Sequence, residues 1–235
     1  MAAAVKTQQL SIIIPVLNEA DSVGRLCNDL QPLRQRGHEV ILVDGGSTDQ
    51  TVAIAQPQVD NVISAVRGRA LQMRAGAAAA SGSVFWFLHA DTTIPGKADQ
   101  LILDALDNRN AQWGRFDVAL SGRHPMLVCV AFMMNLRSTV TSIATGDQGI
   151  FVRRTLYQKT GGIPSISLME DIAFSRMLKA HSRPVCLSEK LVTSARRWHK
   201  HGITRTILTM WCLRLAYYCG VSPDRLEKYY VTDTA

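Results

Sequence analysis

The sequence of 235 residues lacks any run of about 20 uninterrupted apolar residues, which is the length that a membrane-spanning helix requires. Its two most apolar stretches are residues 126–134, which are too few, and residues 203–221, which Arg205 and Arg214 interrupt. Residues 1–9 lack the apolar core of a secretory signal. We therefore expect a cytoplasmic protein whose membrane contact, if it makes one, is peripheral and on the inner face of the cell membrane.

Cysteine is scarce and follows no motif. The five cysteines form no C-x-x-C pair, and an odd number cannot all pair as disulfides within one chain. This argues against a disulfide framework and against a cysteine-ligated zinc site. We expect buried, free thiols at the five positions, which are Cys27, Cys129, Cys186, Cys212 and Cys219.

Signatures of two other protein classes are also missing. No G-x-G-x-x-G segment follows the first predicted strand, which argues against a dinucleotide-dependent oxidoreductase. The 26 Lys and Arg residues outnumber the 19 Asp and Glu residues, and a net charge of +7 attracts polyanions of many kinds. Because no nucleic-acid-binding module is recognisable, we expect no nucleic acid partner.

The first half of the chain alternates apolar, β-branched runs with segments in which apolar residues recur at helical spacing. This alternation predicts an α/β fold, with a mostly parallel sheet that helices cover on both faces. The predicted strands are residues 10–16, 40–43, 61–66 and 84–88, and the predicted helices between them are residues 20–36, 47–55 and 69–80.

The second half is less regular, with predicted strands at residues 114–119 and 149–152 and predicted helices at 126–143, 170–181 and 203–219. The last helix carries one apolar stripe, and its arginines lie off that stripe. Such a basic amphipathic helix can lie in a membrane interface or pack on the domain, and packing is the arrangement that we expect. The stripe consists of Ile207, Trp211, Leu215 and Tyr218.

Polar residues follow the first predicted strand, at the edge where an open parallel sheet binds its ligands. This strand ends near Pro15, which cannot donate a ladder hydrogen bond, and Asn18 and Glu19 then occupy the turn into a helix. Asn18 could equally well cap that helix.

Carboxylates follow the second and fourth strands. The carboxylate of Asp44 is costly at the end of a buried strand unless it accepts hydrogen bonds, and a nucleobase or ribose could donate them. Gly45 would let a ligand approach the backbone closely, although a simple glycine turn is the alternative. After the fourth strand, Asp91 could hold a divalent ion against a diphosphate.

Together these segments resemble the motifs of the family 2 glycosyltransferases with the GT-A fold. That family has P-x-x-N-E, D-x-S-x-D-x-T and D-x-D segments, whose counterparts here are residues 15–19, 44–51 and 89–91. The similarity is closest to a small bacterial subgroup with undefined acceptors, and it covers most of the chain because it continues through residues 146–149, 170–171 and 196–198.

The resemblance implies a single GT-A domain of residues 1–235. Residues 9–95 would form the Rossmann-like half that binds a nucleotide sugar, and residues 96–235 would form the acceptor half. The implied reaction transfers a hexosyl unit, with inversion at the anomeric carbon, from a nucleotide-diphosphate donor that is usually UDP-linked. The acceptor is unidentified and would be lipid-linked or a small molecule.

The resemblance also implies roles for individual residues. Asp171 would be the general base with Glu170 beside it, although two acidic residues also suit the first turn of a helix. Asp91 would hold a divalent cation, Mn²⁺ or Mg²⁺, on the diphosphate. The family's metal motif usually begins with aspartate, whereas His89 stands here, and imidazole suits Mn²⁺ better than Mg²⁺. The donor nucleoside would contact Pro15, Asn18, Glu19, Asp44, Gly45 and Ser47.

The leaving diphosphate needs positive charge, and guanidinium groups bind phosphate in a bidentate manner. Arg67 and Arg69 follow the third strand, and Arg197 precedes Trp198 in the second half. Each of these arginines could equally be a solvated surface residue. His89 could also contact ribose or phosphate rather than a metal.

Two alternative functions stay open from the sequence. A sugar-1-phosphate nucleotidyltransferase has a related sheet, but a long glycine-rich basic loop after its first strand is missing here. A nucleotide-sugar-binding module without turnover is suggested by the histidine in the metal motif. The candidate base and the basic residues argue against that second alternative.

Overall fold

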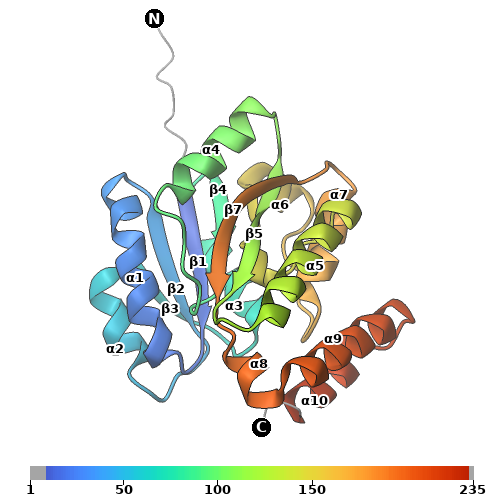
Figure 1. The fold of residues 1–235 in the computed structure, drawn as a ribbon. Helices are drawn as coiled ribbons and strands as arrows, with labels where there is room; N and C mark the ends of the chain where they lie inside the picture. Colours follow the sequence, from blue (N-terminus) through green and yellow to red (C-terminus); the bar gives the residue numbers. More distant parts are fainter. Residues whose placement is uncertain (1–8, 233–235) are drawn as a thin grey trace, which may run out of the picture.

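A computed structural model describes residues 9–232, except for the side chains of Arg197, His199, His201, Val231 and Thr232. Seven strands form one sheet in the order β3-β2-β1-β4-β6-β5-β7 (Figure 1). Only β6 runs antiparallel to its neighbours, so the predicted mostly parallel sheet is confirmed. The strands are β1 (Leu10–Val16), β2 (Glu39–Asp44), β3 (Asn61–Ser64), β4 (Val84–Phe87), β5 (Trp113–Leu120), β6 (Phe151–Arg153) and β7 (Val185–Thr193).

Helices cover both faces of this sheet, and the alternation of side chains along β1 explains why. Ile12 and Ile14 lie in one buried cluster with residues of α1 and α4, whereas Ile13 lies in a second cluster with residues of α3, α6 and α7. The helices are α1 (Ala20–Gln35), α2 (Thr51–Ala55), α3 (Arg69–Ala79), α4 (Ala98–Asn108), α5 (Pro125–Thr141), α6 (Arg154–Lys159), α7 (Glu170–Lys179), α8 (Arg196–His201), α9 (Ile203–Tyr218) and α10 (Pro223–Thr232).

The helix predicted at residues 47–55 begins later than expected, at Thr51. Loop contacts already use the backbone N–H groups of Ser47 and Thr48, because Asp44 and Asn18 accept hydrogen bonds from them. Asp49, which precedes the N-cap residue Gln50, accepts a hydrogen bond from the N–H of Thr51 at 3.0 Å. The prediction was wrong because it counted residues of the preceding turn as helix.

Helix α3 packs unusually close to the sheet at Gly76. A Cβ atom on this residue would lie 2.5 Å from Ile13 Cγ2 and 2.9 Å from Val43 Cγ2, distances at which neighbouring atoms must move. These contacts explain why a glycine stands in the middle of a helix, where it is otherwise unfavourable.

We therefore expect Gly76→Ala to destabilise the protein. The gain in helix propensity is about 1 kcal/mol, whereas overpacking a core costs about 1–3 kcal/mol. Urea denaturation should show a lower midpoint with an unchanged slope. Ala78→Gly, at an exposed position of the same helix, measures the propensity effect alone. A stabilised Gly76→Ala variant would show that α3 can move away from the sheet without penalty.

Two expectations for the surface are corrected. All five cysteines are free, but Cys27 alone is buried; Cys129, Cys212 and Cys219 are exposed. On α9, the domain covers Leu213 and not the predicted stripe, of which Trp211 is 66% exposed. None of the helices in residues 9–232 is long and apolar enough to cross a membrane.

Candidate active site

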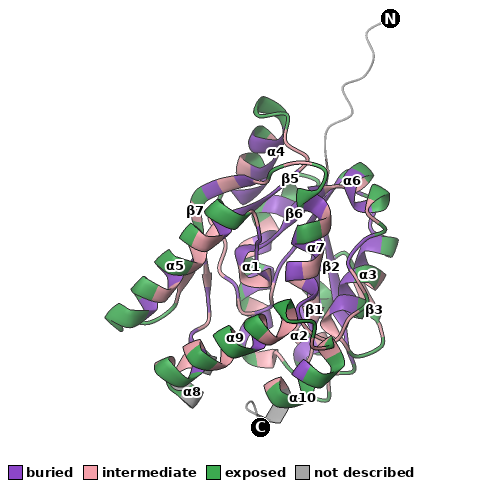
Figure 2. Ribbon diagram, turned by 90° about the vertical axis from the view of Figure 1, so that its right-hand side faces the viewer, coloured by how far each residue is buried: buried purple, intermediate pink, exposed green. Residues whose placement is uncertain are grey.

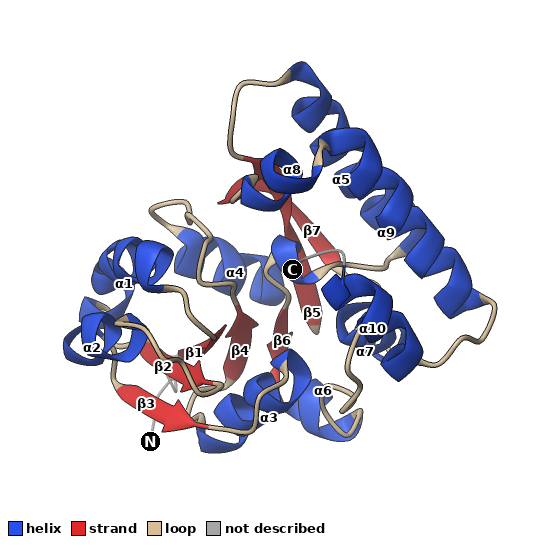
Figure 3. Ribbon diagram, turned by 90° about the horizontal axis from the view of Figure 1, so that it is seen from below, coloured by secondary structure: helices blue, strands red, loops and turns tan. Residues whose placement is uncertain are grey.

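The carboxyl ends of β1, β2 and β4 bring three of the predicted segments to one edge of the sheet. Val16 of β1 pairs with Asp44 of β2, so the turn at Asn18 lies beside the turn that follows Asp44. Ile13 of β1 pairs with Phe87 of β4, which places His89 and the segment after it on the other side of β1. Figure 3 shows the strands from below, with β4 between β1 and β6.

Asn18 joins the two turns through hydrogen bonds. Its Oδ1 accepts from the backbone N–H of Thr48 at 2.8 Å, and its own N–H donates to Ser47 Oγ at 3.0 Å. The backbone of Asn18 is left-handed, with φ of 54°, a conformation that asparagine tolerates better than most residues. Asn18 therefore holds the loop in shape, which is compatible with lining a ligand pocket.

Asp44 is 8% exposed, and the protein itself supplies hydrogen-bond donors to it. Its carboxylate accepts from the N–H groups of Gly46 and Ser47 at 3.0–3.2 Å. A Cβ on Gly45 would lie 3.0 Å from the amide of Gln72, so a side chain here would press on that amide, whereas glycine leaves it in place. The glycine turn that the sequence offered as the alternative is thus present. Contact of Asp44 with a nucleobase stays a prediction.

Gln72 is a residue that the sequence analysis missed. It is buried on α3, and its Nε2 donates at 2.8 Å to the carbonyls of Val16 and Val43, at the ends of two adjacent strands. A glutamine among the alanines on the buried side of α3 was the available signal.

Glu19 connects this loop to the second half of the chain. Its carboxylate lies 3.0 Å from Arg196 Nη2 of α8. Burial raises the pKa of Asp91, and the carboxylates of Asp147 and Glu19 add to that rise, while His89 and Arg196 oppose it. Asp91 therefore lies within electrostatic reach of Glu19 and Arg196 as well as of His89 and Asp147.

His89 and Asp147 form a second contact at this edge, with 3.2 Å between Nδ1 and Oδ1. Burial by itself would raise the pKa of Asp147, but the hydrogen bond from His89 and the charges of His89, Arg69 and Arg214 outweigh it. They lower the pKa of Asp147 to about 2. Asp147 is therefore a carboxylate at any physiological pH.

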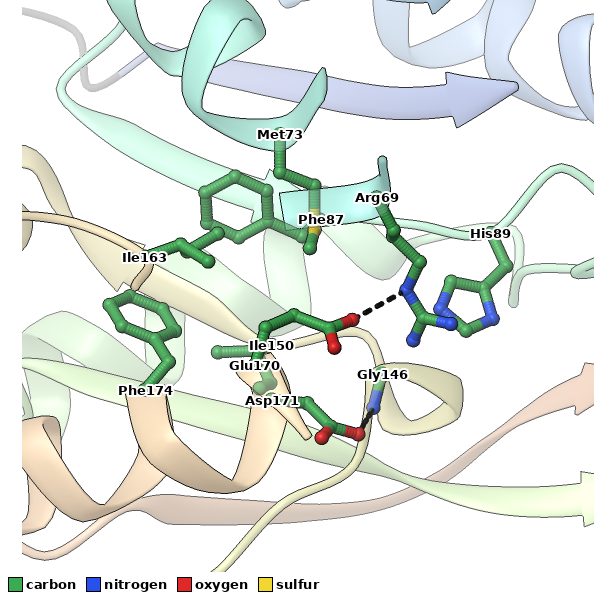
Figure 4. Close-up of a pocket in the computed structure, with 10 residues that line it drawn as sticks. All are labelled: Arg69, Met73, Phe87, His89, Gly146, Ile150, Ile163, Glu170, Asp171 and Phe174. Carbon is green, nitrogen blue, oxygen red and sulfur yellow. Dashed lines mark hydrogen bonds and ion pairs between the residues drawn. The ribbon is translucent and has the colours of Figure 1, made fainter. Parts of the chain in front are cut away.

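Glu170 and Asp171 begin α7, directly after Met169, which has a left-handed backbone with φ of 66°. Glu170 is 5% exposed, and its Oε1 lies 3.0 Å from Arg69 Nε (Figure 4). Asp171 Oδ2 accepts a hydrogen bond from the N–H of Gly146 at 2.9 Å. Burial raises the pKa of Glu170, and Asp171 adds to the rise, while Arg69 opposes it.

Figure 4 shows these side chains around one small pocket, whose polar side is formed by Arg69, His89, Glu170 and Asp171. The other side is apolar and includes Phe87 and Phe174 of the core. The pocket has a volume of about 20 Å³, enough for about one water molecule. A nucleotide sugar is far larger, so it cannot be held inside this pocket.

The chemistry of the site fits a divalent cation that the protein holds only in part. Within residues 9–232, no group of three or more His, Cys, Asp or Glu side chains could hold a metal ion alone. Magnesium beside nucleotide phosphates commonly takes one or two carboxylates and completes its shell with phosphate and water oxygens. Asp91 suits that role, since its carboxylate has no hydrogen bond or ion pair with any described residue.

His89 suits the metal role less well. Its Nδ1 contacts Asp147, and its Nε2 is enclosed by protein, without a hydrogen-bond partner among the described residues. A Cβ on Gly146 would lie 2.6 Å from that nitrogen. A metal ion would reach His89 only after the ring turned.

The structure thus brings most predicted residues into one continuous group, from Asn18 and Asp44 through Glu19 and Asp91 to Asp171. Arg67 is exposed after β3, and no contact joins it to the other predicted residues in the described part of the chain. Trp198 is half-buried on α8, and the side chain of Arg197 lies outside the described residues. Arg69 contacts Glu170, a pairing that the sequence did not predict.

Comparison with known proteins bears on the same segments. The model of the family described as Glycosyl transferase family 2 matches residues 11–155, more than half of the chain. That match includes Asn18, Asp44 and Asp91. A comparison with the curated proteins found no match.

Solved structures support the fold. TarS of S. aureus (residues 1–349) is 18% identical, with a TM-score of 0.63 over 80% of this chain and 61% of that chain. The same TarS segment was also solved with UDP-GlcNAc, and it matches with a TM-score of 0.63, 18% identity and coverage of 80% and 59%. This chain therefore spans less than two thirds of the TarS segment.

Glucosyl-3-phosphoglycerate synthase of Mycobacterium tuberculosis, solved with Mn²⁺, UDP and glucosyl-3-phosphoglycerate, is 19% identical. Its TM-score is 0.63 over 91% of this chain and 81% of that chain. At this level of identity the likeness establishes the GT-A fold and leaves the substrates open. The family model, which matches more than half of the chain, shows that the chain belongs to glycosyl transferase family 2.

Proposed function

We propose that this enzyme transfers a sugar from a UDP-linked donor to a hydroxyl group of an acceptor, with inversion at the anomeric carbon and with Asp171 as the general base. The observation that carries the proposal is the grouping of Asp44, Asp91 and Asp171 around one edge of the sheet. The UDP-bound state of the related synthase and of TarS favours uridine as the base.

The donor would lie along the loops that follow β1, β2 and β4. The turn formed by Asn18, Asp44 and Ser47 would receive the nucleoside, with Pro15 and Glu19 beside it. The diphosphate would then reach Asp91, and a divalent cation bound there would neutralise charge on the phosphates. Arg196 is 56% exposed at this point and adds positive charge.

Asp171 is available for the acceptor because its carboxylate is half-buried and faces the site (Figure 4). It would take the proton of the acceptor hydroxyl as that oxygen forms a bond to the anomeric carbon. The bond from this carbon to the diphosphate oxygen breaks in the same step, and UDP leaves with the electron pair. Attack from the face opposite UDP inverts the anomeric carbon. A positioned base of this kind contributes about 10²–10⁴-fold to the rate.

Thermal shift with UDP tests the donor part of the proposal. A ligand at 100 times its dissociation constant stabilises the native state by about 2.7 kcal/mol, which raises Tm by roughly 5–10 °C for a chain of this size. UDP with Mn²⁺ should give such a shift, and GDP and ADP should give smaller ones. Asp91→Asn should remove the part of the Tm shift that depends on Mn²⁺ and keep the Tm shift that UDP gives without the metal. The donor assignment is wrong if no nucleoside diphosphate shifts Tm, with or without the metal.

A further inference from the structure

Large apolar side chains are exposed mainly on two helices. Thirteen of them are exposed among the described residues, and ten of these lie on α5 or α9. The two helices lie on the same side of the molecule in Figures 1 and 3, and Figure 2 shows exposed stretches along both. We define the α5–α9 face by its six most exposed apolar side chains, which are Val128, Phe132, Val140, Leu208, Trp211 and Leu215.

Helix α5 exposes an apolar outer side in addition to the buried Leu127 and Ala131 on its inner side. Polar side chains attach it to the sheet: Asn135 hydrogen-bonds both the N–H and the carbonyl of Val118 in β5, at 2.9 and 3.0 Å. Arg115 of β5 donates to Thr139 at 2.7 Å. The side that faces away from the domain is apolar, with Phe132 63% exposed. A surface helix normally exposes a polar side, and a large exposed apolar patch is typical of a surface that binds a partner or a membrane.

The charge of the segments that contain α5 and α9 indicates which kind of surface would bind them. Residues 118–146 and 190–223, which contain α5 and α9, carry eight of the 26 Lys and Arg residues and none of the 19 Asp and Glu residues. The remaining chain has 18 basic and 19 acidic residues, so the whole net positive charge belongs to these regions. Arg123 and Arg205, at the starts of α5 and α9, are exposed.

We propose that the α5–α9 face docks onto the interface of a lipid bilayer that contains anionic lipids. Apolar and aromatic side chains such as Phe132 and Trp211 would enter the boundary between headgroups and acyl chains, and the arginines would contact anionic headgroups. A second copy of this chain is a poorer occupant, because a symmetric dimer would bring the basic segments of two chains together.

The position of this face relates it to the candidate active site. Arg214 of α9 contributes to the electrostatic field at Asp147, and Arg137 of α5 is an electrostatic neighbour of Asp171. Docking would therefore hold the site beside the membrane surface, with the acceptor half of the chain toward the lipid.

Flotation of the full chain with vesicles tests the proposal. The protein should float with vesicles of phosphatidylcholine and phosphatidylglycerol and bind pure phosphatidylcholine more weakly, and salt should weaken the binding. Trp211→Ser with Leu215→Ser should lower the binding constant by at least about tenfold, because two large apolar side chains are lost from the interface. Arg123→Gln should lower it by about fivefold.

Val66→Ser is the matched control, since Val66 is 74% exposed but lies after β3, away from both helices. Its binding should equal that of the wild type. Brominated lipid provides a second measurement on unmodified protein: it should quench tryptophan fluorescence. Trp211→Phe should remove most of the quenching, because Trp86 and Trp113 are fully buried and Trp198 is half-buried. Equal binding by the wild type and the double variant would overturn the proposal. The proposal would also be overturned if the wild type bound no vesicles but formed a dimer that the double variant does not form.

Discussion

Replacement of Asp171 by asparagine should lower the rate of sugar transfer by about 10²–10⁴-fold and leave donor binding unchanged. Asparagine keeps an oxygen that can accept the hydrogen bond from the Gly146 N–H, so the turn that begins α7 should keep its shape. It cannot take a proton from the acceptor. The measurement is the release of UDP from the UDP-sugar that gives the largest thermal shift, with water in place of the unidentified acceptor.

Glu170→Gln provides the comparison for this prediction. Glu170 is buried and paired with Arg69, so it is poorly placed to receive a proton from a substrate. We expect this variant to lose less than about tenfold in turnover, and to differ from wild type mainly in stability, since Arg69 loses its charged partner. Near-normal turnover in Asp171→Asn would reject Asp171 as the base. A larger loss in Glu170→Gln than in Asp171→Asn would transfer the role to Glu170.

The strands of the first half could be predicted because each contains a short apolar run, and those of β1, β2 and β4 are buried on both faces of the sheet. β1 was predicted with its observed bounds, and β2, β3 and β4 to within about two residues. β7 was missed because it has no continuous apolar run: its buried side chains alternate with less buried ones, and Lys190 interrupts its pattern. Its pairing with β5 joins residues that are far apart in the sequence, and no local signal reports that pairing.

The residues of the candidate site also fall into those that the sequence could predict and those that it could not. Strand ends identify Asn18, Asp44 and Asp91, because the rule that ligands bind beyond the carboxyl ends of parallel strands needs only the strand positions. It could not reveal that Arg69 pairs with Glu170, since that contact depends on how α7 lies against α3. The same holds for the apolar stripe of α9. Periodicity identified the stripe, but only the tertiary structure shows that Leu213 packs inward and Trp211 faces outward.

Gly146 should be the most sensitive glycine of the site. Its N–H holds Asp171, and a Cβ added to it would overlap Arg69 Nη2 and lie 2.6 Å from His89 Nε2. Its backbone does not need glycine for conformational reasons, because its φ is not positive. Space is the reason for glycine at this position, because Arg69 and His89 lie where a Cβ would stand while Asp171 binds the N–H.

We therefore expect Gly146→Ala to lower kcat/KM by about 10²-fold, the scale on which a shift of about 1 Å in catalytic groups acts. The fold should survive, because Arg69 is flexible and 38% exposed and can turn away from the added methyl group. Loss of activity without loss of cooperative unfolding would distinguish this effect from a damaged core.

Gly96→Ala is the matched control, because a Cβ at Gly96 meets no atom within 4 Å and its φ is not positive. It should keep wild-type activity and stability. If Gly146→Ala keeps full activity as well, the positions of Arg69 and His89 do not limit the reaction. The contact between Gly146 and Asp171 would then serve only to begin α7, and the base would have to be identified by its own substitution rather than by the packing around it.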